Sequence, residues 1–229
     1  MKKIGIIGGL GPLSTIEYYN RIINDYRKIT NDQNYPQLFI NSINMTEMLD
    51  YVSKNEYERL IELLVNEIGK LKMIGADYAA IASNTPHCVI NEVIDKVTVP
   101  IISIVEETCK YVKNRGIRKV LLTGTYFTME KNFYGKAFEK HNIECIVPNE
   151  NEKNIIHNII FPNLENGIII EKEKNTFKDI CNKIIRDKKI DGIILGCTEL
   201  PLMIKENDFD ISVLDTMEIH IKSIVEKIV

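Results

Sequence analysis

The chain has 229 residues, and its 29 Lys and Arg against 32 Asp and Glu give a formal net charge of −3. This near balance argues against a protein that binds nucleic acid or a membrane surface. A composition of 45% hydrophobic and 27% charged residues is typical of a folded globular protein and excludes a disordered or fibrous chain. No stretch reaches the roughly 18 apolar residues that span a bilayer, and residues 4–10 lack the features of a signal peptide, so we expect a cytoplasmic protein.

Apolar runs suited to buried strands alternate with apolar residues at helical spacing along the chain. Residues 4–9 predict a first strand, and the apolar residues between Ile16 and Ile23 then predict a helix. Further strands are expected at residues 38–43, 78–82, 99–104, 119–123, 144–147, 192–195 and 212–214. Such alternation predicts an α/β fold with mainly parallel sheets.

Two pairs of segments repeat at nearly the same interval. Gly8 aligns with Gly124 at an offset of 116 residues (124 − 8), and Ser83 aligns with Cys197 at an offset of 114 residues (197 − 83). Both offsets are close to half the chain length. We therefore expect two pseudo-symmetric lobes, each a mainly parallel sheet flanked by helices, with the active site between them. The first lobe is predicted to comprise residues 1–98 and 208–229, and the second residues 99–207.

Cys197 is the cysteine whose setting indicates chemistry. The five cysteines contain no C-x-x-C pair and indicate neither a disulfide framework nor a zinc site. Three of them fall within apolar patterns and are expected to be packed as small hydrophobic side chains: Cys109, Cys145 and Cys181. Cys197 instead follows a predicted strand and precedes Thr198, a residue type that caps helices. Because a helix N-terminus lowers the pKa of a nearby thiol, we expect Cys197 to be reactive.

Ser83 is predicted at the matching position of the first lobe, with Asn84, Thr85 and His87 behind it. Ligands bind beyond the carboxyl ends of parallel strands, so we expect Ser83 and Cys197 to face one cleft. A serine-hydrolase triad is not indicated, because G-x-S-x-G is absent and His87 is expected at the surface or as a cap. The structural alternative for Ser83 is a helix N-cap.

The glycine-rich segment at residues 8–12 does not match a nucleotide-binding pattern. It lacks the Gly-Lys-Ser/Thr of a Walker loop, and a dinucleotide fingerprint starting at Gly9 would need a third small residue at Ser14 and an acid about twenty residues on at a strand end. We expect a tight turn whose backbone N–H groups, at Leu10 and Gly11, bind a small carboxylate.

In order and spacing, the segments GGLGP (8–12), SNTPH (83–87) and GCTELP (196–201) resemble the three motifs of the aspartate/glutamate racemase family. The likeness runs through nearly the whole chain, and Gly-Cys-Thr-Glu is distinctive of the aspartate racemase branch. The resemblance implies a homodimer of two-lobed chains. It also implies racemisation without pyridoxal phosphate or any other cofactor or metal, by two thiols on opposite faces of the substrate α-carbon.

On this resemblance Cys197 and Ser83 form the catalytic pair. Groups that bind substrate are expected at Leu10, Gly11, Asn84, Thr85, Thr125, Thr198 and Lys174. The sequence departs from the family pattern at Ser83, where cysteine is usual. A hydroxyl releases its proton far less readily than a thiol, so the face that Ser83 serves should react slowly. Ser83 is either the natural residue or a Cys→Ser substitution.

The expected substrate is aspartate or glutamate, whose second carboxylate needs a cationic partner. Residues 40–52 contain no Arg or Lys, which leaves Lys172 and Lys174 as candidates. Two other functions fit the residues: a single-cysteine decarboxylase or isomerase of a small diacid, and a carboxylate-binding module without turnover. Exchange of the substrate α-proton with deuterium would separate a racemase from both.

Overall fold

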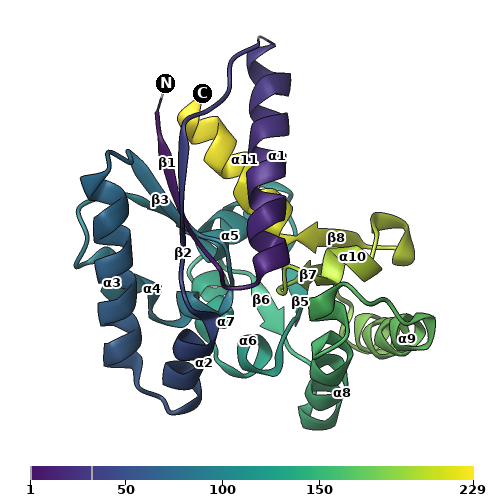
Figure 1. Cartoon of the computed structure of the whole chain (residues 1–229). Helices are drawn as coiled ribbons and strands as arrows, with labels where there is room; N and C mark the ends of the chain where they lie inside the picture. Colours follow the sequence, from purple (N-terminus) through teal and green to yellow (C-terminus); the bar gives the residue numbers. More distant parts are fainter. Residues whose placement is uncertain (1, 32) are drawn as a thin grey trace. The chain divides into compact units, whose positions relative to one another are not determined.

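The structure, a computed structural model, describes residues 2–31 and 33–229 and contains two four-stranded parallel sheets (Figure 1). The strand order is β2-β1-β3-β4 in the first sheet and β6-β5-β7-β8 in the second. The two orders correspond strand for strand, so the predicted internal repeat is confirmed at the level of topology. All eight predicted strands are present, which confirms the α/β fold class.

The first sheet is built from strands whose side chains are mostly apolar. Its strands are β1 (Ile4–Gly8), β2 (Leu38–Ser42), β3 (Tyr78–Ile81) and β4 (Ile101–Ile102). The helices around it are α1 (Pro12–Thr30), α2 (Met45–Ser53), α3 (Tyr57–Met73), the 3₁₀ helix η1 (Thr85–Val89) and α4 (Ile90–Ile94). Figure 1 shows α1 and α3 on opposite sides of this sheet. Every residue of β1 is buried, as expected for a central strand covered on both faces.

The second sheet repeats this plan. Its strands are β5 (Lys119–Thr123), β6 (Glu144–Ile146), β7 (Gly192–Leu195) and β8 (Ser212–Asp215). Its helices include α6 (Tyr126–Glu130), α7 (Phe133–Glu139), α8 (Glu150–Ile160), η2 (Leu164–Asn166), α9 (Glu171–Lys188), α10 (Leu200–Met203) and η3 (Glu206–Asp208). A core of Leu121, Ile193, Ile156, Phe177 and Cys181 joins β5 and β7 to α8 and α9.

Two further helices, α5 (Ile104–Asn114) and α11 (Thr216–Ile228), carry the chain between two compact units. One unit ends at Glu107 and resumes at His220–Val229, and the other is Thr108–Ile219. The chain passes from one unit to the other at 107/108 and again at 219/220. The predicted boundaries, 98/99 and 207/208, both lie earlier in the chain. The physical reason is strand pairing, because β4 is bonded to β3 in the first sheet and β8 to β7 in the second.

The end of α11 packs with the first unit. His220 lies on α11, and its ring contacts the Tyr18 hydroxyl of α1 and the carbonyl of Ile102 in β4. In the part of the chain that the structure describes, no helix combines the length and apolar character that a membrane crossing requires.

Candidate functional site

Ser83 lies at the carboxyl end of β3, the third strand of the first sheet in chain order. The preceding residue, Ala82, donates its backbone N–H to the carbonyl oxygen of Ile7 in β1 at 2.9 Å. This bond ties the loop to the central strand beyond the regular ladder. Ser83 is 8% exposed, so its hydroxyl sits in a protected position. The cap residue of η1 is Asn84, and therefore Ser83 is not the N-cap that the structural alternative required.

His87 supports this loop from inside the first unit. Its backbone N–H donates to the carbonyl of Asn84 at 3.0 Å, and its ring Nδ1 lies 2.9 Å from the carbonyl oxygen of Ser83. The ring is buried, and this burial, with the nearby His220 ring, lowers the pKa of His87 to about 3. The expectation of a surface or capping histidine is therefore wrong. A single sequence gives no sign of burial for a polar residue on a short helix.

Cys197 occupies the equivalent position of the second sheet, after β7. Its preceding residue, Gly196, donates its backbone N–H to the carbonyl of Thr123 in β5 at 2.8 Å, matching the bond from Ala82 to Ile7. A Cβ on Gly196 would lie 2.6 Å from the Thr123 carbonyl oxygen, so only glycine allows this approach. The two loops are thus built alike, with Ser83 and Cys197 in corresponding places.

Threonine hydroxyls hold the end of β7 from both sides. The hydroxyl of Thr123 donates to the carbonyl of Ile194, and that of Thr216, just after β8, donates to the carbonyl of Leu195, each at 2.8 Å. Both threonines are fully buried. Because these bonds satisfy carbonyls at the strand end, the loop that carries Cys197 starts from a fixed point.

The thiol of Cys197 donates a hydrogen bond to the carboxylate of Glu199. The distance from Sγ to Oε2 is 3.0 Å, and the Thr198 hydroxyl donates to the same oxygen at 2.9 Å. Glu199 is only 6% exposed. A buried carboxylate beside a thiol is a group that can take its proton. Glu199 is therefore in a position to accept the proton of the Cys197 thiol.

The pKa of Cys197 lies well above its usual value, contrary to the expected lowering. Burial of the thiol is the main cause, and the negative charge of Glu199 adds to it. The helix that follows, α10, has only four residues and offers too small a dipole to offset these effects. The thiol is therefore protonated at rest, and a thiolate forms only by proton transfer to a neighbour.

Glu165 is a second acidic group whose field reaches Cys197. It lies in η2, and partial burial together with the charge of Glu199 raises its pKa to about 7. Its charge in turn raises the pKa of Cys197. Near neutral pH, Glu165 is thus partly protonated, and each proton it takes up reduces the negative charge around the thiol.

The expected carboxylate-binding groups lie in loops at the carboxyl ends of the strands. Leu10 and Gly11 follow β1, where the Thr15 hydroxyl accepts from the N–H of Gly9 and donates to the carbonyl of Gly11. Asn84 and Thr85 follow β3, and Thr198 follows Cys197. Thr125 follows β5 and caps α6, accepting from the N–H of Thr128 at 3.4 Å. Each therefore lies within its own unit at the strand edge where ligands bind in parallel sheets.

Lys174 has a partner other than a ligand. Its ammonium lies 3.3 Å from one carboxylate oxygen of Asp208, and Lys178 lies 2.8 Å from the other. Against the effect of burial, hydrogen bonds from Lys178, the backbone N–H of Lys205 and Lys174 lower the pKa of Asp208 to about 2. To bind a substrate carboxylate, Lys174 would have to exchange this contact. Lys172 is exposed on the same helix.

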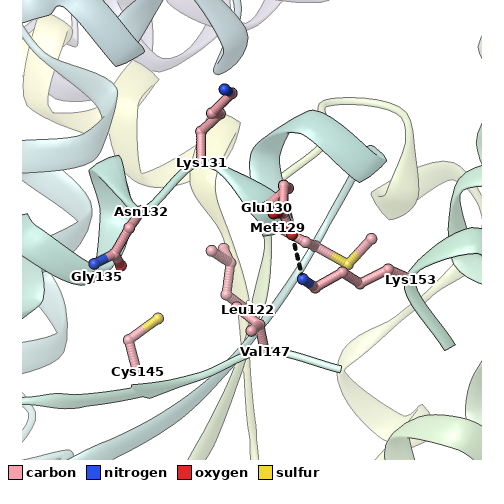
Figure 2. Close-up of a pocket in the computed structure, with 9 residues that line it drawn as sticks. All are labelled: Leu122, Met129, Glu130, Lys131, Asn132, Gly135, Cys145, Val147 and Lys153. Carbon is pink, nitrogen blue, oxygen red and sulfur yellow. Dashed lines mark hydrogen bonds and ion pairs between the residues drawn. The ribbon is translucent and has the colours of Figure 1, made fainter. Parts of the chain in front are cut away.

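A cavity of about 170 Å³ in the second unit is lined by residues other than the predicted site residues (Figure 2). Its walls include Leu122, Val147 and Cys145, and Figure 2 shows the Lys153 ammonium paired with the Glu130 carboxylate beside them. Burial raises the pKa of Cys145 to about 12, so this thiol is not a nucleophile at neutral pH. The described residues also contain no group of three or more His, Cys, Asp or Glu that could hold a metal ion.

Several groups around the site had no assigned role on the sequence alone. Glu199 lies inside the GCTELP segment, two residues after Cys197, and this short spacing could have indicated a contact between the two side chains. Glu165, 34 residues before Glu199 in the sequence (199 − 165), offered none, because its contribution depends on how η2 packs. The contacts of His220 with Tyr18 and Ile102 likewise depend on tertiary structure.

A model of the Asp/Glu/Hydantoin racemase family matches residues 7–224. Among characterised proteins, the chain is 24% identical over 225 residues to the broad specificity amino-acid racemase RacX of Bacillus subtilis (strain 168), covering 97% of this chain and 96% of RacX.

Solved structures share the fold over its full length. An aspartate racemase homologue from Pyrococcus horikoshii OT3 has a TM-score of 0.88 and 40% identity, with 99% of both chains covered. Glutamate racemase from Francisella tularensis subsp. tularensis SCHU S4, in complex with D-glutamate, has a TM-score of 0.70 and 18% identity, with 99% of this chain and 80% of that chain covered. The second likeness concerns the fold alone.

Proposed function

We infer that this chain, which belongs to the Asp/Glu/Hydantoin racemase family, inverts the α-carbon of an amino acid by proton transfer at Cys197 and Ser83. The observation that carries the proposal is the equivalence of these two positions. Each follows the third strand of a four-stranded parallel sheet, and in each the preceding residue is bonded to the first strand. Two matched loops suit a reaction that needs one acid/base group for each face of a carbon atom.

In the proposed reaction Glu199 accepts the proton of the Cys197 thiol. The resulting thiolate removes the α-proton of the substrate, and the carbanion then receives a proton on the opposite face, from the Ser83 hydroxyl or from water in its place. The backbone N–H groups of Leu10 and Gly11, with the polar side chains of Asn84 and Thr198, would bind the α-carboxylate and stabilise the developing negative charge. The chemistry requires no pyridoxal phosphate and no metal.

The substrate proposed on the family motifs is aspartate or glutamate. A broader range is supported by the likeness to RacX, a broad specificity amino-acid racemase. The Glu165 and Glu199 carboxylates near Cys197 oppose a second negative charge. Lys174 supplies a compensating cation only if the substrate displaces Asp208. A cytoplasmic homodimer stays our prediction for the assembly.

Ser83 favours a second candidate, a decarboxylase or isomerase of a small diacid that uses Cys197 alone. A hydroxyl is a poor base at neutral pH, so one thiol is the only strong acid/base group of the pair. A decarboxylase would release carbon dioxide and incorporate deuterium only at the carbon that loses it. A carboxylate-binding module would do neither.

The test is α-deuterium uptake from aspartate, glutamate and other amino acids in D₂O, with wild type and Cys197→Ala. We expect wild type to exchange the α-proton and Cys197→Ala to lose exchange to background while keeping its fold by circular dichroism. Cys181→Ala is the matched control, since this thiol is fully buried in the core of the same unit and should affect stability by a few kcal/mol at most. A folded Cys197→Ala protein with an undiminished rate would overturn the proposal.

A further inference from the structure

His87 has two contacts with the loop that carries Ser83. Its backbone N–H bonds the carbonyl of Asn84, and its ring bonds the carbonyl of Ser83. Consecutive carbonyl oxygens of the loop are thus held by one residue. Because the ring reaches back four positions, its place determines where the Ser83 peptide lies.

The Ser83 contact determines the tautomer of His87. A carbonyl oxygen only accepts, so Nδ1 carries the hydrogen and Nε2 has a free lone pair. Nε2 is buried and has no hydrogen-bond partner among the described residues. The structure therefore bonds the ring to the loop through Nδ1 and not through Nε2.

Burial of its own ring keeps His87 neutral near pH 7, and a second buried imidazole lies close to it. His220 donates from Nε2 to the carbonyl of Ile102 at 2.8 Å and accepts at Nδ1 from the Tyr18 hydroxyl at 2.7 Å. Burial lowers the pKa of His220 to about 4, and its nearness lowers the pKa of His87 further. An imidazole that stays neutral cannot serve as an acid at neutral pH. Its contribution is geometric.

We propose that His87 is a positioning residue for Ser83, which it aligns through the bond from ring Nδ1 to the Ser83 carbonyl. This role rests on the proposed function. Removal of the bond should move the acid/base group at position 83 and leave Cys197, in the other unit, unaffected. We expect α-proton exchange to be lost on one face of the substrate only. A general loss of stability would instead lower exchange on both faces.

The experiment uses the Ser83→Cys protein, in which a thiol replaces the weakly acidic hydroxyl. The enantiomer whose α-deuterium exchange rises on this substitution is the one that position 83 serves. Adding His87→Leu should lower exchange of that enantiomer by about tenfold or more, since small displacements of catalytic groups cost up to about a hundredfold. Exchange of the other enantiomer should change by less than about twofold.

His87→Asn is the matched rescue, because its side-chain amide can place a donor near the position of Nδ1. We expect it to restore the lost exchange to within about threefold, whereas His87→Gln, with its donor further out, should not. Equal losses from both enantiomers, no loss, or failure of all three variants to fold would overturn the positioning role. Absence of any exchange with His87 intact would instead overturn the proposed function itself.

Discussion

At the scale of single residues, the properties of Cys197 come from its neighbours more than from its place after a strand. The sequence predicts a thiol made acidic by a helix N-terminus, but burial and Glu199 raise its pKa. The same carboxylate that disfavours the thiolate accepts a hydrogen bond from the thiol at 3.0 Å. In the proposed mechanism, reactivity therefore depends on the proton shared between Cys197 and Glu199 and not on a resting thiolate.

Glu199→Gln separates these two effects. Removing the carboxylate should lower the pKa of the Cys197 thiol, so that Cys197 is alkylated faster by iodoacetamide at pH 8, as followed by peptide mass mapping. Exchange of the substrate α-proton should nevertheless fall, by about a hundredfold, because the proton acceptor is lost. Glu171→Gln, at an exposed carboxylate on α9, should change neither rate. Faster alkylation together with unchanged exchange would show that Glu199 takes no part in the chemistry.

Ser83→Cys tests the other half of the proposed pair. A thiol ionises near neutral pH and a hydroxyl does not, so inversion should rise strongly in both directions. The measurement is the conversion of D- to L- and of L- to D-amino acid by chiral chromatography, with deuterium uptake followed separately from each enantiomer. Turnover that stays at the wild-type value in a folded variant would remove Ser83 from the mechanism.

At the scale of elements, the site depends on strand ends that approach closely. Gly196 lets the loop after β7 lie against β5, and the fully buried Thr123 and Thr216 satisfy the last carbonyls of the strand. The glycine in GCTELP is therefore needed for packing, while the cysteine beside it is the residue proposed to carry the chemistry. One short motif thus combines a packing requirement, at Gly196, with a proposed chemical role, at Cys197, and the sequence alone does not separate the two.

Two glycine-to-alanine changes should have opposite effects on stability. A Cβ at Gly196 meets the Thr123 carbonyl at 2.6 Å, so Gly196→Ala should lower the free energy of unfolding by about 1–3 kcal/mol. Gly69 lies inside α3 with nothing within 4 Å of the same added atom, and Gly69→Ala should raise the free energy by about 0.5–1 kcal/mol. Urea unfolding of both variants against wild type gives the comparison. A neutral or stabilising Gly196→Ala would contradict the close approach.

The elements themselves were largely predictable, and the contacts between them were not. Alternating apolar runs predict all eight strands, since buried parallel strands have a strong sequence pattern. The lobe boundaries depend on β4, which has only two residues, and on which sheet it joins. The pairing of Glu199 with Cys197 was within reach of the sequence. The burial of His87 and the field of Glu165 were not, because they arise from packing between distant segments.

At the scale of the whole molecule, buried ionisable groups make stability depend on pH. Burial lowers the pKa of His87 to about 3 and that of His220 to about 4 from the ordinary 6.5. Below pH 6.5 these two imidazoles bind protons in the unfolded chain but not in the folded chain. The free energy of unfolding therefore falls as the pH drops toward 4. Glu165, with its pKa raised to about 7, has the opposite trend, since its stabilising proton is lost as the pH rises through 7.

Urea unfolding at pH 7.5 and pH 5.0 should reveal the histidine contribution. Each buried imidazole should cost about 2 kcal/mol of stability between these values, from 1.36 kcal/mol per pKa unit. In His87→Asn, which keeps a donor but cannot be protonated, the difference between the two pH values should shrink by about 2 kcal/mol. Comparison of the two proteins cancels the trend due to Glu165. An identical difference in both would contradict a neutral buried His87.

The division of the chain into two units sets an order in which they can be completed during synthesis. Residues 108–219 are continuous, so the second unit has all its sequence before the first does. The first unit is incomplete until residues 220–229 have been made. These residues include His220, whose ring bonds Tyr18 and Ile102. On the ribosome the first unit therefore cannot be completed until residues 220–229 have been made, whereas the second unit can. Until then the Tyr18 hydroxyl and the end of β4 lack the imidazole that joins them.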